Sequence, residues 1–274
     1  MYRELDNTIV WEIEKKKIYS GKLIPGYNVI TRNDNGNVLA VAKSSYTPML
    51  NSEFIDVAGK IQEISGFELI GFNEFKKGKR VLGFLKNNRE NFYIGNHEIK
   101  SFLLIGNSFD GSSSFFQGTS SLLIRCQNQF SQIQVHNKIR HTKQIKTKLE
   151  EFYFYLESYF KQNKDLLNNF EKLGDIKLTE ELREKMISFV LDVKEVTDKE
   201  LSARKQKQID LLRNSMFREI KDLGDNMFGA FQGVTFYTTH ELSTRESAFG
   251  NVFGAPATIN NRALEFANKQ LVLS

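Results

Sequence analysis

The chain has 274 residues, of which 40% are hydrophobic and 26% charged, and its formal net charge is +5. This apolar fraction, which includes 23 phenylalanines, excludes a disordered chain, because such chains lack the large side chains whose burial offsets ordering entropy. The apolar runs, such as residues 102–105, are far shorter than the roughly 20 residues of a membrane helix. We therefore expect a globular protein without a membrane partner.

The first half of the chain predicts strands around one helix. Residues 27–42 contain two β-prone runs joined by an Asn-Gly pair, which favours the type I′ turn of a hairpin. A helix is expected next, with Asn51 or Ser52 as its N-cap and Gly66 as its end, because apolar residues recur at helical spacing between them.

Four further strands are predicted at residues 67–75, 80–86, 101–108 and 115–127. The first two flank a lysine-rich turn, residues 76–79. The element order is then β-β-α-β-β-β-β, which indicates an α+β fold with an antiparallel sheet.

From Thr142 to Gly174 the apolar residues follow a helical period, so one long helix is expected there. We place a domain boundary at Gly174. Residues 1–174 form the expected α+β core, and residues 175–274 form a mostly helical C-terminal region that packs on the core.

Three more helices are predicted in the C-terminal region. Thr179 opens the first, and a capping-box pattern of Thr197 with Glu200 predicts a second that ends before Gly224. The last helix is expected at residues 259–271.

The N-terminus mixes acids and bases without an apolar stretch, unlike a signal peptide. The single cysteine, Cys126, cannot form an internal disulfide and fits a reducing compartment. We therefore expect a cytoplasmic protein.

Two intervals of the chain contain no carboxylate, one between Glu74 and Glu90 and one between Asp110 and Glu150. Such intervals favour binding to a polyanion. A third basic cluster at residues 204–218 also carries acids and is interpreted as a solvated face. The acid-free intervals hold the cations Lys76, Lys77, Lys79, Arg80, Lys86, Arg89, Arg125, Lys138, Arg140, Lys143, Lys146 and Lys148.

The expected helix start near Thr142 would offer unpaired N–H groups and the positive end of the helix dipole to a phosphate. Arg140, Lys143 and Lys146 would share one face there, and the turn at residues 76–80 would form the opposite wall of a groove. The alternative is that Thr142 only caps the helix and the lysines are solvated.

Signatures of catalysis are mostly absent from the sequence. No Walker phosphate loop occurs, and His136 and His141 lack a nearby carboxylate or cysteine that would complete a metal site. We therefore expect no catalytic residue, metal or cofactor. One alternative stays open: Glu74 and Lys76 form an E-x-K pattern that, with Asp56, would mimic a metal-dependent nuclease.

Several short motifs follow one another along the chain: GYNVITR at 26–32, YTP at 46–48, LLIGNSFDGS at 103–112, RCQN at 125–128, RHT at 140–142, GVTFYT at 233–238 and SAFG at 247–250. Together they resemble the phage/plasmid-like protein family that is catalogued as a domain of unknown function. The stretch before Ser101 departs from the family pattern by being shorter. The resemblance implies a mobile element in a bacterial host cell.

The predicted element order is similar to the core of single-strand annealing proteins of the Rad, RecT, Redβ and Erf kind. Those proteins form rings or filaments and pair complementary strands without ATP. The similarity implies an annealase-like core that binds single-stranded DNA during recombination, as a homo-oligomer. The rival functions are the nuclease and a phage protein-interaction module, for example one that counters host defence.

The candidate DNA-binding residues fall into three groups. Lys76, Lys77, Lys79 and Arg80 would hold one side of the strand through its phosphates. The opposite side would be held by Arg125, Lys138, Arg140, His141, Lys143 and Lys146. The residues that would position the backbone or order the loop are Asn107, Ser108, Gln127 and Asn128.

Overall fold

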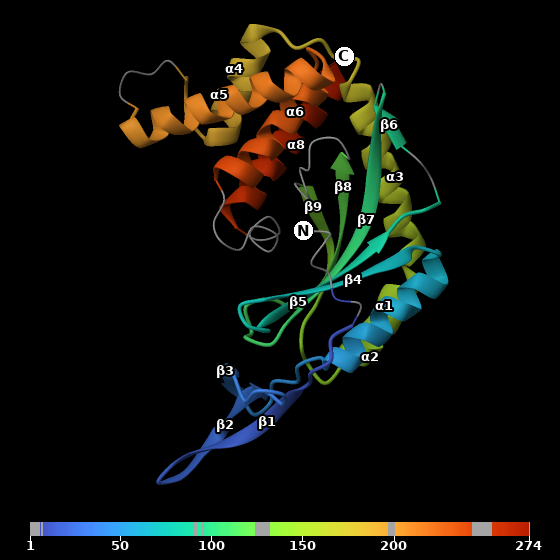
Figure 1. The fold of residues 1–274 in the computed structure, drawn as a ribbon, viewed down its shortest axis with the longest axis vertical. Coiled ribbons are helices and arrows are strands. Elements are labelled where there is room, and N and C mark those ends of the chain that lie inside the picture. The colour runs from blue at the N-terminus through green and yellow to red at the C-terminus, as the bar shows by residue number, and fades with distance from the viewer. Residues whose placement is uncertain are drawn as a thin grey trace. The chain divides into compact units, whose positions relative to one another are not determined.

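A computed structural model describes the backbone of most of the chain (Figure 1). The fold is α+β with antiparallel sheets, as the sequence predicts. The described residues are 6, 8–89, 92–94, 96–123, 132–196, 201–242 and 254–273.

The chain forms two compact units. The first comprises Met1–Glu90, Ser101–Thr119 and Gln134–Phe160, and the second comprises Asn91–Lys100, Ser120–Ile133 and Lys161–Ser274. The domain boundary at residue 174 stays a prediction.

The first unit begins with a three-stranded antiparallel sheet, which we call the N-terminal sheet. It consists of β1 (Ile13–Ser20), β2 (Lys22–Arg32) and β3 (Val38–Lys43), in that order. The predicted hairpin is confirmed as β2 and β3, but its turn is not type I′, because only Gly36 of the Asn-Gly pair has a positive φ. The strand β1 was not predicted, because a run of three lysines, Lys15 to Lys17, occupies its centre and hides the β pattern.

Helix α1 (Asn51–Ser65) confirms the predicted helix, and Gly66 ends it with a positive φ of 67°. Its N-cap is Leu50, not Asn51 or Ser52 as expected. The reason is that the backbone N–H groups of Asn51 and Ser52 donate to the carboxylate of Glu12, so a distant acid replaces a local cap.

The second sheet has six strands. It contains β4 (Glu68–Phe75), β5 (Arg80–Lys86), β7 (His97–Ser108), β8 (Phe115–Leu123) and β9 (Gln132–Ile139) in the order β4-β5-β7-β8-β9, and the short β6 (Phe92–Ile94) pairs with β7. The predicted hairpin of β4 and β5 is confirmed. Strand β9 was not predicted, and Lys138 and Ile139 lie in it, before the helix start that was expected near Thr142.

Helices α1 and α2 (Ile145–Phe154) pack against the six-stranded sheet through aromatic side chains. Phe54 of α1 lies 5.9 Å from Phe72 and 6.4 Å from Phe115 between ring centroids, and Phe152 of α2 lies 6.0 Å from Phe115. All four side chains are buried. This cluster forms the centre of the core of the first unit.

The single long helix expected from Thr142 is two helices. Helix α2 starts at Ile145, and α3 (Leu156–Leu173) follows after a break at Tyr155. The apolar stripe continues across this break, so the sequence period does not reveal it.

The second unit contains α4 (Glu180–Leu191), α5 (Ala203–Leu223), α6 (Met227–Phe236), the π-helix η3 (Tyr237–Glu241) and α8 (Ala255–Leu273). Thr179 caps α4, as predicted, by accepting from the N–H of Leu182. The helix expected near residue 198 starts at Ala203, because Ser202 caps it, and residues 197–200 lie outside the described part. In the described parts, no helix is both long and apolar enough to cross a bilayer.

Candidate functional site

The two acid-free intervals meet at one end of the six-stranded sheet. At this end β5 begins at Arg80, which pairs with Ser108 at the end of β7. The hydroxyl of Tyr46 donates to the carbonyl of Ser108 at 3.1 Å and lies 2.7 Å from Nδ1 of His141, just after β9. The basic turn at residues 76–79 and the segment after β9 therefore lie at the same end of this sheet.

The turn at residues 76–79 has a strained backbone and an exposed basic surface. Lys76 and Lys77 have positive φ values of 53° and 59°, and both side chains are exposed. Gly78 lies so close to the Trp11 ring that an added Cβ would come within 2.8 Å of it. Packing against Trp11 therefore fixes this turn and leaves the lysines facing solvent.

Arg80 and Ser108 order the loop that joins β7 to β8. The Nε of Arg80 donates to Oγ of Ser112 at 2.9 Å and lies 3.7 Å from a carboxylate oxygen of Asp110. The buried hydroxyl of Ser108 donates to the carbonyl of Ser113 at 2.7 Å. The contacts of Ser108 fit the loop-ordering role predicted for it, and those of Arg80 give this arginine a structural partner within the protein.

Asn107 and His141 are buried, so neither is exposed to a nucleic acid strand at the surface. The Nδ2 of Asn107 donates to the carbonyl of Met49 at 3.2 Å. His141 is 8% exposed, and burial lowers its pKa to about 4, so it is neutral at pH 7. This corrects the expectation that His141 contacts a phosphate, because a neutral, buried imidazole offers no charge at the surface.

A cavity of about 430 Å³ lies at the start of α2. Three cations line it, together with polar side chains and one acid, Glu151, which accepts from Lys148 at 2.7 Å. Lys138 and Arg140 are exposed. The lining includes Lys138, Arg140, Thr142, Gln144, Lys148 and Tyr155.

The expected common face of Arg140, Lys143 and Lys146 is not formed. Lys146 lies 3.4 Å from the carboxylate of Glu53 and lines a different cavity, of about 290 Å³, between α1 and α2. Lys143 is exposed just before the helix. Because α2 starts three residues later than predicted, Arg140 and Lys143 precede the helix instead of sharing its surface with Lys146.

Sequence reasoning missed two exposed aromatic side chains beside the cavity. Phe154 and Tyr155 stand at the break between α2 and α3, are 80% and 55% exposed, and contact each other at 5.1 Å between ring centroids. The sequence did indicate that these two rings are exposed, since neither residue belongs to the apolar stripe of Leu149, Phe152 and Leu156.

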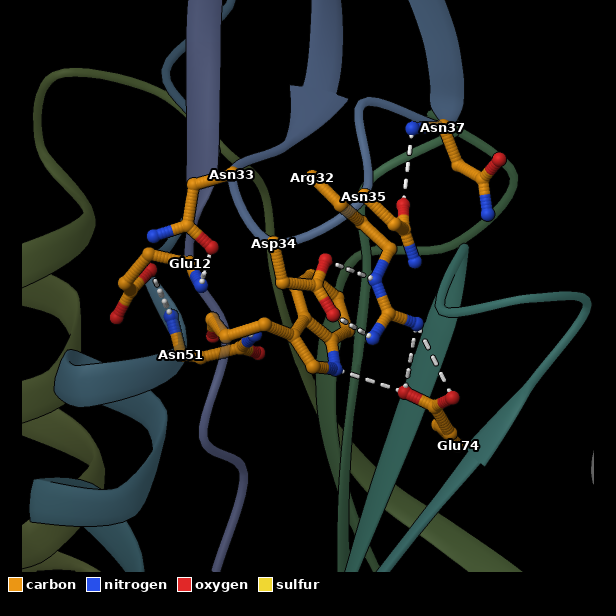
Figure 2. A network of polar contacts seen from close by, with 9 residues as sticks. Glu12, Arg32, Asn33, Asp34, Asn35, Asn37, Asn51 and Glu74 are labelled. Carbon is orange, nitrogen blue, oxygen red and sulfur yellow. Dashed lines mark hydrogen bonds and ion pairs between the residues drawn. The ribbon is translucent and has the colours of Figure 1, made fainter.

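Glu74, the acid of the E-x-K pattern, is part of a structural network (Figure 2). Both of its carboxylate oxygens accept from Nη1 of Arg32, at 3.0 and 3.1 Å, and one accepts from Nε1 of Trp11 at 2.7 Å. The guanidinium of Arg32 also bonds Asp34 and lies 4.1 Å from the Trp11 ring centroid. This network ties β2 and the segment before β1 to β4.

The two carboxylates of the nuclease alternative are not assembled. Glu74 lines a cavity beside Trp11, whereas Asp56 lines the cavity between α1 and α2. Within the described ranges, no group of three or more histidine, cysteine, aspartate or glutamate residues could hold a metal ion.

Three candidate residues, Arg125, Gln127 and Asn128, lie outside the described residues, and so does Cys126. Of the described candidates, Asn107, Ser108 and His141 are buried, and the basic ones are exposed or half-buried. The exposed basic set consists of Lys76, Lys77, Lys138, Arg140, Lys143 and Lys146, whereas Lys79 and Arg80 are half-buried.

Comparisons with known proteins identify a family. Neither the curated proteins nor the solved structures include a match to this chain. A family model described as a domain of unknown function (DUF932) matches residues 38–254, which is more than half of the chain. The motifs of the sequence analysis fall largely within that span, and the chain belongs to the DUF932 family.

Proposed function

We propose that this protein binds single-stranded DNA and anneals complementary strands without ATP, in phage or plasmid recombination. The observation that carries the proposal is the meeting of two acid-free basic intervals, far apart in sequence, at one end of one sheet. Two cationic surfaces at the same end of a sheet fit a polyanion better than solvated charges scattered over the surface do.

The exposed cations would contact phosphates, and the aromatic pair would contact bases. Lys76 and Lys77 face solvent from the turn, while Arg140 lines the cavity after β9. Phe154 and Tyr155 offer flat rings beside that cavity, and base stacking on such rings tolerates any sequence. Binding would therefore be sequence-independent and sensitive to salt.

The annealing step is proposed by analogy of element order. An antiparallel sheet followed by helices resembles the core of the annealing proteins named above, although fold alone does not determine function. A homo-oligomer, as a ring or filament, would present two strands side by side. Light scattering with and without DNA tests this, and a monomer under both conditions would contradict the annealing step.

The decisive assay follows two complementary fluorescent oligonucleotides at several salt concentrations, without metal or ATP. Pairing faster than the spontaneous rate, lost as salt rises, supports the proposal. A strand that is shortened on addition of Mg²⁺ would indicate a nuclease instead. Binding that does not depend on oligonucleotide length would favour a protein-interaction module.

A matched pair of variants locates the interface. In R140Q/K143Q two phosphate contacts are lost, so the log–log salt slope flattens by about 1.4 and affinity at 0.1 M salt falls about 25-fold. The control R204Q/K207Q removes the same charges from the exposed start of α5 and leaves binding unchanged. Equal behaviour of both variants would show that the interface lies elsewhere.

A further inference from the structure

The N-terminal sheet exposes an unusual number of apolar side chains. In the described residues, Tyr19, Tyr27 and Val41 are 66%, 46% and 63% exposed, and three neighbours on the same strands, Leu23, Ile24 and Val38, are also exposed. Burying such side chains is favourable, so a cluster of them left in water indicates a contact surface.

The same sheet carries a strong positive charge. Its strands hold five lysines, whereas Glu14 is their only acidic residue. One lysine is structural, since Nζ of Lys15 donates to the carbonyls of Ser44 and Tyr46, both at 2.7 Å. Lys16 forms an ion pair with Glu14 but keeps 56% of its side chain exposed, and the other lysines are exposed: Lys17, Lys22 and Lys43.

The strand register places charges beside apolar side chains. Lys16 of β1 pairs with Val29 of β2, which pairs with Val41 of β3, so these three side chains share one face. Tyr27 pairs with Lys43 on that face. The result is a sheet face with an aromatic ring and aliphatic groups between cations.

This chemistry favours a polyanion with flat apolar groups over a second copy of the chain. Strand β1 is an edge strand, and consecutive lysines on an edge oppose pairing with another positively charged edge. Nucleic acid single strands supply both phosphates for lysines and bases for tyrosine rings.

The sheet is held firmly and next to the basic turn. Arg32 at the end of β2 is fixed by Asp34, Glu74 and Trp11 (Figure 2). Gly78 of the turn at residues 76–79 lies directly against Trp11 and Arg32. The lysine turn thus connects the N-terminal sheet with the candidate site in a single compact unit.

We propose that the N-terminal sheet is a second contact for the same nucleic acid strand, with its lysines on phosphates and Tyr19 and Tyr27 stacked on bases. This inference rests on the proposed function. It extends the interface from the cavity after β9, across the lysine turn, to the hairpin of β1 and β2.

The test separates bases from phosphates. In Y19S/Y27S, affinity for an oligo-dT strand falls at least about 30-fold, because two stacking contacts are lost. Affinity for an abasic oligonucleotide of equal length stays at the wild-type value, since it has phosphates but no bases. The control Y93S, which removes an exposed tyrosine from β6, binds both strands as the wild type does.

Charge is tested with K16Q/K43Q, which removes two lysines from the face of Tyr27 and Val41 and flattens the salt slope by about 1.4 for both oligonucleotides. If the wild type binds neither strand, the proposed function fails. If R140Q/K143Q weakens binding but Y19S/Y27S and K16Q/K43Q bind both strands as the wild type does, this inference alone is overturned. Binding to phosphatidylserine vesicles that is lost in Y19S/Y27S, with DNA binding intact, would also overturn it in favour of a membrane surface.

Discussion

Removing the Glu74 carboxylate should destabilise the first unit far more than removing an exposed carboxylate. In Glu74→Ala, the guanidinium of Arg32, whose side chain is 9% exposed, loses one of its two acidic partners. The Nε1–H of the buried Trp11 loses its acceptor. A buried donor left unpaired costs about 1–3 kcal/mol, and a charge-assisted bond contributes about 1.5–3 kcal/mol.

The sum must be reduced, because Glu74 is 40% exposed and water can replace part of the lost contacts. We therefore expect the free energy of unfolding to fall by about 3 kcal/mol. The matched control is Glu150→Ala, which breaks the exposed ion pair with Lys60 in the same unit and costs less than about 1 kcal/mol.

The assay is urea unfolding followed by intrinsic fluorescence, since Trp11 is the single tryptophan and reports on this network directly. With a slope of about 2 kcal/mol per M, the midpoint of Glu74→Ala lies about 1.5 M below that of the wild type. Equal midpoints for Glu74→Ala and Glu150→Ala would refute the reasoning that the network stabilises the unit.

Three more predictions concern stability. Burial holds the pKa of His141 at about 4 in the folded state, against 6.5 in the unfolded state. The free energy of unfolding is therefore full above pH 6.5 and falls by about 3 kcal/mol as the pH drops toward 4. Urea titrations at pH 7.5 and 4.5 should show that this loss is smaller in His141→Gln. Gly106→Ala should lower the melting temperature, because its Cβ would overlap the buried ring of Phe116; an unchanged value contradicts the packing. Thr179→Ala should cost about 1 kcal/mol by chemical denaturation through the lost cap of α4, and Thr179→Ser should restore it.

The sequence predicts local elements where turn and cap chemistry is explicit. The Asn-Gly pair gave the hairpin of β2 and β3, Gly66 gave the end of α1, and Thr179 gave the start of α4. Prediction from the sequence fails where a contact with a residue far away in the chain determines the local structure. At the start of α1, Glu53 accepts from the N–H of the N-cap residue Leu50, which is a local signal, but nothing within residues 50–55 indicates that Glu12 also reaches this first turn.

For the candidate site too, the composition of the chain can be read from the sequence, whereas the geometry cannot. The absence of acids identifies both basic intervals, but their meeting depends on Tyr46, which bonds Ser108 and lies beside His141. Burial is equally hidden, since Asn107 and His141 look like surface polar residues in the sequence. A long-range contact removes them from the interface and makes them part of its support.

The network of Trp11 and Arg32 also shows that the family match is smaller than the folding unit. The match starts at residue 38, so it contains β3 and Glu74 but excludes β2, the strand to which β3 is bonded. It ends at residue 254, before α8, whose Ala263 and Leu264 belong to the core of the second unit. A fragment cut at the match limits would expose an unpaired strand at one end and an open core at the other, so expression of this family should use boundaries beyond both.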